Sequence, residues 1–222
     1  MPVSTAEHSP EQQQGHPLAM LIGGPRGAIE SMLPPVAFVV VYLSTNSNLT
    51  AAVATALSIG LILAALRLKR GERPIRVTGA LLVVVLAAML AYYTGSAAAY
   101  FWPLVLANIA SALAFALSIL IKWPLLGVIV GPITGTGMRW RQDPDLLRAY
   151  SRASWIWVLL NVVRAAVQIP LIQGEELWAL AAVRPIFYLM VIGVVLWSWV
   201  IIKKALPPDH PGIRSPRLPA SN

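Results

Sequence analysis

The stretch "WIWVLLNVVRAAVQIPL", residues Trp155 to Leu171, is an apolar run with one arginine, Arg164, near its middle. A helix needs roughly 20 apolar residues, with a range of about 17 to 25, to cross a bilayer core of about 30 Å. This run is long enough, and the rest of the chain contains several more of the same kind. We therefore expect an all-α integral membrane protein, in which such runs and the charges between them decide the fold.

The composition supports this class. Of the 222 residues 57% are apolar and only 12% are charged, whereas about a quarter are charged in a soluble domain. The chain has no Cys, which excludes disulfides and thiolate chemistry. Its histidines, His8, His16 and His210, all lie in polar terminal segments. We therefore expect neither a metal site nor a cofactor in the membrane domain.

Six apolar runs predict six transmembrane helices within a membrane domain spanning residues 23–206. Residues 1–22 and the Pro-rich residues 207–222 are predicted to be disordered cytoplasmic tails. The predicted spans are Ile29–Leu43, Thr50–Leu66, Val77–Thr94, Tyr100–Ile121, Trp155–Leu171 and Leu177–Ile202.

Lysine and arginine predict the orientation. They cluster in the link "RLKRGERPIR", before the fifth span and after the last span, while the loops "STNSN", "GSAAA" and "QGEE" contain none. The positive-inside rule places both termini and the basic links in the cytoplasm, as in a multi-pass protein of the cell membrane. The positive charge would then meet the lipid bilayer and its anionic headgroups. No folded soluble face carries this charge, so we expect no nucleic-acid binding.

The apolar segment Trp123–Met138, "WPLLGVIVGPITGTGM", lies between two basic borders. A crossing here would move the next basic link outside, so the segment is predicted to be re-entrant or interfacial. Gly127, Gly131 and Gly135 recur every four residues, which favours close helix packing, within the chain or between copies in a homo-oligomer. Alternatively, Pro132 and "TGTG" break the helix and expose backbone groups to a ligand.

Several short motifs occur together: "GGPRGAIESMLPPVAFVVVY", "RLKRGERP", "KWPLLG", "WRQDPDLLRAY" and "VVRAAVQIPL". In this order they resemble actinobacterial integral membrane proteins of the domain of unknown function 3159 family, over roughly residues 23–202. The stretch "LPPVAFVVVYLSTNSNLTAAVATALSI" is more weakly similar to bacterial intracellular septation protein A. The first resemblance implies a small multi-pass membrane protein and brings no activity or catalytic residue.

Candidate site residues are the few polar ones inside the predicted spans. Arg164 lies about 13 Å from one end of its span and Arg184 about 10 Å from the opposite end of the next, so both fall near the same depth. Asn161, Arg164 and Gln168 share one helical face, and Arg184 and Tyr188 form an i, i+4 pair. The candidate residues are Glu30, Asn108, Asn161, Arg164, Gln168, Arg184 and Tyr188.

Three interpretations of the arginines remain open. Arg164 is a structural charge satisfied by carbonyl groups, Asn108 or Glu30. Alternatively, Arg164 and Arg184 face a midplane cavity between the last two spans and bind a small anionic ligand. In the third interpretation Glu30 is the general acid of a membrane-embedded enzyme acting on an isoprenoid or lipid, as in a terpene cyclase.

Asp143 and Asp145, in "RQDPDLLRAY", are two close carboxylates that invite a metal or acid–base interpretation. The alternative is structural: Asp143 caps a helix that begins at Pro144, and Asp145 pairs with Arg148 one turn later.

The sequence thus favours binding or transport of a small anionic or amphipathic molecule. A structural partner in cell-envelope assembly and an enzyme are the alternatives.

Overall fold

A computed structural model describes residues 24–217 of the chain, and over this range every regular element is helical. This confirms the predicted all-α class. The α-helices are α2 (Gly24–Ser44), α3 (Leu49–Lys69), α4 (Pro74–Thr94), α5 (Trp102–Leu120), α6 (Leu125–Ile133), α7 (Pro144–Gln173) and α8 (Leu177–Ala205), with 3₁₀ helices η1 (Ala97–Phe101) and η2 (Arg139–Gln142).

Five helical segments are long and apolar enough to cross a membrane: α3, α4, η1 with α5, α7 and α8. The apolar part of α2, Ile29–Ser44, is shorter. Large apolar side chains such as Leu61, Leu117 and Leu189 are more than half exposed. A surface this apolar is typical of helices that face lipid. Each predicted span has its helix, and five of the six meet the length for crossing.

Helix α7 begins well before the predicted boundary at Trp155. Asp143 caps its first turn by accepting hydrogen bonds from the backbone N–H groups of Asp145 and Leu146, at 3.0 and 3.3 Å. Pro144 then occupies the first helical position, where its missing N–H costs nothing. The cap and the proline extend the helix into a polar stretch that an apolar pattern alone does not include.

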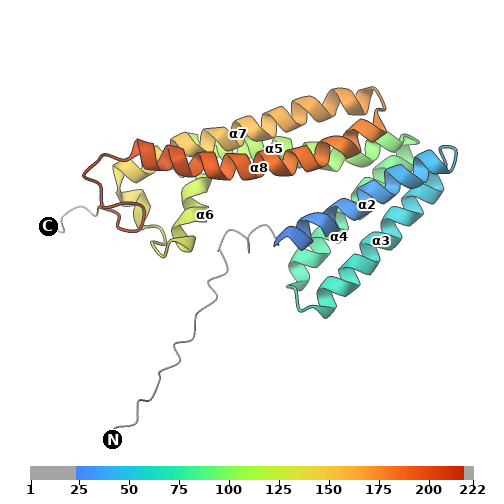
Figure 1. Ribbon diagram of the computed structural model, residues 1–222, viewed down its shortest axis with the longest axis horizontal. Coiled ribbons are helices and arrows are strands. Elements are labelled where there is room, and N and C mark those ends of the chain that lie inside the picture. Colours follow the sequence, from blue (N-terminus) through green and yellow to red (C-terminus); the bar gives the residue numbers. More distant parts are fainter. Residues whose placement is uncertain (1–23, 218–222) are drawn as a thin grey trace, which may run out of the picture.

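The helices form two groups. Figure 1 shows α2, α3 and α4 on one side and α5, α7 and α8 on the other, and the two groups diverge from the end of the molecule where η1 lies. At this η1 end, the Ser96 hydroxyl donates to the Glu175 carboxylate at 3.1 Å and so joins the α4–η1 link to the α7–α8 link.

The core at the η1 end holds the two groups together. Phe38 of α2 stacks on Tyr100 of η1, with ring centroids 4.3 Å apart. Small residues of α3 and α4, such as Ala56 and Ala91, are fully buried beside them. Small side chains allow helix backbones to approach closely where hydrocarbon surrounds them.

A second core lies at the opposite end, where the short helix α6 packs against α7 around Trp140 and residues from the end of α8 complete the cluster. Trp140 is fully buried, and its ring meets that of Tyr150 edge to face with centroids 5.4 Å apart. A nine-residue helix rises only about 14 Å, less than half of the bilayer core of about 30 Å. Helix α6 therefore does not cross by itself.

The glycines of α6 serve this core. A Cβ atom at Gly127 would lie 2.8 Å from the Trp140 ring, and one at Gly131 would lie 2.1 Å from the Gly137 carbonyl oxygen. Gly135 has a positive φ of 76° just beyond the helix. Trp140 of the same chain thus packs on Gly127 and Gly131, so packing within the chain accounts for the spacing of these two glycines.

We expect Gly131→Ala to destabilise the protein by about 1–3 kcal/mol, because the added methyl group overlaps backbone that cannot easily move. Gly193→Ala is the matched control, since a Cβ there meets nothing within 4 Å and Ala favours a helix interior. Melting temperatures in detergent measure both. An unchanged Gly131→Ala protein would contradict the packing described for Trp140.

Candidate functional site

A cavity of about 290 Å³ lies in the angle between the two helix groups. We call it the central cavity. Its wall is mainly apolar, with polar residues from α2, α3, η1 and α8. The lining residues are Glu30, Ser31, Pro34, Pro35, Gly60, Leu63, Ala64, Arg67, Val77, Ala80, Leu81, Val83, Val84, Ala87, Tyr100, Pro103, Leu104, Arg184 and Tyr188.

Small residues and prolines leave this space open. Gly60, Ala64 and Ala80 present little or no side chain to the cavity from α3 and α4. On α2, Pro34 and Pro35 have no N–H, so two carbonyl groups one turn earlier lose their usual helical donors. The cavity therefore combines an apolar wall with backbone that has spare acceptor capacity.

Arg184 is the notable cation of the cavity wall. Its guanidinium carbon lies 5.8 Å from the centre of the Phe101 ring. Within residues 24–217 this guanidinium has no hydrogen bond and no ion pair. Its one defined interaction there is the cation–π contact with Phe101. Tyr188, one turn along α8, shares a 2.8 Å hydrogen bond with the Ser31 hydroxyl of α2. This hydrogen bond ties α2 to α8 beside the cavity.

Glu30 has different partners from those expected. The Arg67 Nε donates to one carboxylate oxygen at 2.9 Å, and Arg70 donates to the other. Glu30 was one of the partners considered for Arg164, but its carboxylate pairs instead with the basic link after α3, which lies closer to the start of α2. Guanidinium groups thus contact both oxygens, which favours the ionised carboxylate over the protonated acid that the enzyme interpretation requires.

Arg164 does not line the central cavity. Its guanidinium carbon lies 5.2 Å from the centre of the Phe187 ring on α8, and its buried Nε has no hydrogen-bond partner in the described chain. Helices α7 and α8 pack against each other, and the cavity described here lies between the two helix groups. The cavity lies elsewhere because α8 turns Arg184 toward α2 and η1 instead of toward α7.

The other predicted polar residues form hydrogen bonds within and between α5, α7 and α8. Asn108 donates to the Gln168 side-chain oxygen at 2.8 Å, and both residues are buried. Asn161 donates to the Trp157 carbonyl one turn earlier, and the Trp157 indole donates to Ser198 of α8 at 3.1 Å. The structure therefore separates the seven candidates: Glu30, Arg184 and Tyr188 line the cavity, and the other four belong to helix interfaces.

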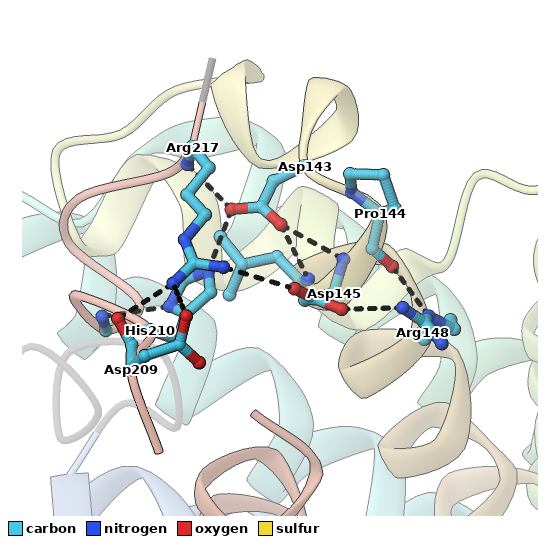
Figure 2. Close-up of polar contacts among 9 residues, drawn as sticks. Asp143, Pro144, Asp145, Arg148, Asp209, His210 and Arg217 are labelled. Carbon is cyan, nitrogen blue, oxygen red and sulfur yellow. Dashed lines mark hydrogen bonds and ion pairs between the residues drawn. The ribbon is translucent and has the colours of Figure 1, made fainter. Parts of the chain in front are cut away.

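A second polar cluster surrounds Asp143 at the start of α7 (Figure 2). One of its carboxylate oxygens caps α7; the other accepts from His210 Nε2 at 2.9 Å and from the Arg217 backbone N–H at 2.7 Å. The His210 and Asp143 side chains are both fully buried. Residues 207–217, expected to form part of a disordered tail, here fold back onto α7 as a strap.

The ligand atoms of Asp143, Asp145 and His210 lie within 4.8 Å of one another, a spacing that could hold a metal ion. Their hydrogen bonds favour the structural interpretation instead. Asp145 pairs with Arg148 at 2.6 Å, as predicted, and lies 3.9 Å from Arg217. The Gly212 N–H donates to His210 Nδ1, so Nε2 must carry the proton that it shares with Asp143. The carboxylates are thus already matched by protein donors and cations.

Burial alone would raise the pKa of Asp143, but hydrogen bonds from Arg217, His210 and the α7 backbone outweigh burial and lower it. The pKa of the exposed Asp209 is also lowered, first by its hydrogen bond from Arg217. The strap is therefore anchored to ionised carboxylates at neutral pH.

The family profile described as "Protein of unknown function (DUF3159)" matches residues 22–209, which include every helix of the structure. The chain belongs to the DUF3159 family. This confirms the DUF3159 family resemblance drawn from the short motifs. No curated protein and no solved structure matches this DUF3159 chain. The functional argument for this DUF3159 protein therefore depends on its own residues.

Sequence reasoning missed the cavity-lining roles of Tyr100, Arg67 and the prolines of α2. Arg67 belongs to the charges that predict the topology, and its position at the end of a predicted span is the signal for its place in the cavity wall. His210 gave no signal, because nothing in a Pro-rich tail indicates that it returns to a residue 67 positions earlier.

We expect Asp143→Asn to release the strap, because an amide group offers donors where the structure needs only acceptors. The loss should be about 1.5–3 kcal/mol, as for hydrogen bonds to a charged group. A fluorophore on a cysteine at the exposed Ser215 should show lower anisotropy in this variant. Asp209→Asn, which removes only an exposed partner of Arg217, should retain most of the wild-type anisotropy.

The same anisotropy should depend on pH. Because folding lowers the pKa of Asp143, its contribution to strap stability is fully present above the ordinary value near 3.8. It is lost as the pH falls through the lowered value in the folded protein. Anisotropy should therefore fall on acidification below about pH 4, whereas Asp143→Asn should start low and show no such step. A wild-type signal that stays flat to acid unfolding would contradict the role given to Asp143.

Proposed function

We propose that this DUF3159 protein binds an anionic amphipathic molecule in the central cavity, with Arg184 as the anion partner. The observation that carries the proposal is a guanidinium on the wall of a mainly apolar cavity with no acceptor among the described residues. A cation in such surroundings is unfavourable unless a negative group accompanies it. A ligand phosphate or carboxylate would supply that group and accept the guanidinium fork.

The shape of the charge distribution supports an amphipathic ligand over a small inorganic anion. Arg184, Tyr100 and Tyr188 form one polar region of the wall, while Leu63, Leu81 and Val84 form an apolar one. At the other polar region, Arg67 is already engaged with Glu30, which leaves Arg184 as the cavity arginine without an acid partner. An anionic head beside Arg184 and an apolar chain along α3 and α4 satisfy both regions.

We further propose that six helices, α2 included, cross the cell membrane with both termini in the cytoplasm, and that α6 is re-entrant or interfacial. The loops at the η1 end contain no Lys or Arg, whereas the opposite links are basic, as the positive-inside rule requires for a cytoplasmic side. In this orientation the ion pair of Glu30 with Arg67 faces the cytoplasm and Arg184 lies toward the outer half of the membrane.

Arg184→Leu tests the proposal against the matched control Arg164→Leu, which removes an arginine that also stacks on a Phe ring but lies outside the cavity. The probes are a medium-chain alkyl phosphate and the alcohol of the same chain length. Wild type and Arg164→Leu should bind the phosphate at least about tenfold more tightly than the alcohol, as one charge-assisted contact allows. Arg184→Leu should lose this preference. Isothermal titration in neutral detergent measures the affinities.

The Arg184→Leu protein should keep or gain thermal stability, because a buried cation is replaced by an apolar side chain of similar size. Ala64→Leu, which keeps Arg184 and narrows the cavity, should weaken binding of both probes. Equal preference for the phosphate in wild type and Arg184→Leu would overturn the assignment of Arg184, and no effect of Ala64→Leu would overturn the assignment of the cavity.

The topology has its own test, because the chain has no native Cys. A cysteine at the exposed Ser47 should react with an impermeant reagent added outside intact cells, and one at the exposed Glu72 should not. A cysteine at Gln142 should also be protected if α6 returns to the cytoplasmic side. Labelling at Gln142 with protection at Glu72 would show that the α6 segment crosses the membrane.

A further inference from the structure

A second site suited to an anion lies at the α5–α6 link, at the end of α5 away from the central cavity. A groove here is lined by Lys122, Trp123, Met138, Arg141, Gln142 and Leu147. Among residues 24–217, no carboxylate lies within ion-pair distance of Lys122 or Arg141, whereas Asp145 nearby is paired with Arg148. The groove thus gathers two cations and an amide without an internal counter-charge.

The backbone holds these groups in place. Lys122 has a positive φ of 55°, a conformation that favours glycine and is strained for a lysine. The N–H groups of Lys122 and Trp123 donate to the carbonyls of Ile119 and Ser118, at 3.0 and 2.8 Å. The Ser118 hydroxyl in turn accepts from the Leu125 N–H at 3.1 Å, which fixes the other side of the link. The lysine is therefore presented by a rigid turn.

Arg141 is fixed by its aromatic neighbour. Its guanidinium carbon lies 3.9 Å from the centre of the Trp123 ring, the shortest such distance among the arginine and lysine contacts described. A guanidinium held on a ring face still points its donors outward along the plane. The ring contact therefore holds Arg141 at the groove without using its hydrogen-bond donors.

The surroundings of the groove identify the kind of anion. Leu113, Leu117 and Leu120 are 58%, 58% and 70% exposed, follow a helical spacing on α5, and lead to Lys122. Trp123 and Met138 add apolar surface at the groove itself, at 39% and 46% exposure. Such a stripe accommodates an acyl chain, and the two cations at its end accommodate the phosphate attached to it.

We propose that the Lys122–Arg141 groove binds the phosphate of an anionic phospholipid, whose acyl chain lies along the exposed leucines of α5. The Arg141 fork and the Lys122 ammonium contact the phosphate oxygens, and the Gln142 amide donates to the headgroup. Free phosphate shares the same charge chemistry but would gain nothing from the apolar stripe. This site is independent of the central cavity and of Arg184.

The test uses the full chain in neutral detergent micelles, with melting temperature followed as phosphatidylglycerol, phosphatidylcholine or inorganic phosphate is added. Phosphatidylglycerol should raise the melting temperature of wild type at far lower concentration than phosphatidylcholine. Lys122→Gln with Arg141→Gln should raise the half-maximal phosphatidylglycerol concentration about tenfold or more, as the loss of one or two charge-assisted contacts implies. Arg141→Lys should give an intermediate value, because it keeps the charge and loses the fork.

The matched control is Lys203→Gln with Lys204→Gln at the end of α8, where Lys203 also lies over an indole ring, 5.0 Å from the Trp199 centroid. This control removes the same charge and should keep the phosphatidylglycerol response, as should Arg184→Leu. If the double groove variant does not fold, Gln142→Glu places a carboxylate among the two cations without removing them. This variant should also weaken the response.

Three outcomes would overturn the proposal. Equal losses in the groove and α8 double variants would show a general charge effect. A full response to inorganic phosphate alone would show a soluble anion site without a role for the acyl chain. A phosphatidylglycerol response abolished by Arg184→Leu and kept in the groove variant would assign the lipid to the central cavity.

Discussion

Hydrocarbon offers no hydrogen-bond partner, so each polar side chain between these helices depends on a partner from the protein. The hydrogen bonds of Asn108 with Gln168, and of Trp157 with Ser198, join α5, α7 and α8 in this way. Arg184 departs from the rule, because it has only an aromatic ring beside it. Arg164 also has a buried Nε without a hydrogen-bond partner, but it lies beside Phe187 outside the cavity. Arg184 lines the cavity, and its unpaired guanidinium gives the cavity its chemical character.

The position of the cavity follows from how the two helix groups meet. The stacked rings of Phe38 and Tyr100 close the η1 end, and the Ser31–Tyr188 hydrogen bond joins α2 to α8 beside the cavity. Away from these contacts the groups diverge (Figure 1), and small residues of α3 and α4 leave the angle unfilled. A cavity between two helix groups is sensitive to their relative tilt, so a ligand held there would also fix that tilt.

The helical class and the positions of the helices could be predicted from the sequence, because apolar run length is a strong and local signal. The cap at Asp143 and the ion pair of Asp145 with Arg148 could also be predicted, from the motif "DPDLLR". The partners of Glu30 and Arg164 could not be predicted, because the depth of a residue along a helix does not reveal toward which neighbouring helix its side chain points. Arg164 and Arg184 illustrate this: similar depth, adjacent helices, and yet one faces Phe187 while the other faces Phe101.

The strap has a consequence for the order in which the protein is completed. Synthesis proceeds from the N-terminus, so α7 emerges with Asp143 able to cap its first turn before His210 and Arg217 exist. The second carboxylate oxygen gains its donors only when His210 and Arg217 have been added. A truncated product ending at α8 would carry all the apolar helices and still leave a carboxylate without two of its partners. The hydrogen bonds at Asp143 therefore form in full only after residues 210–217 have been synthesised.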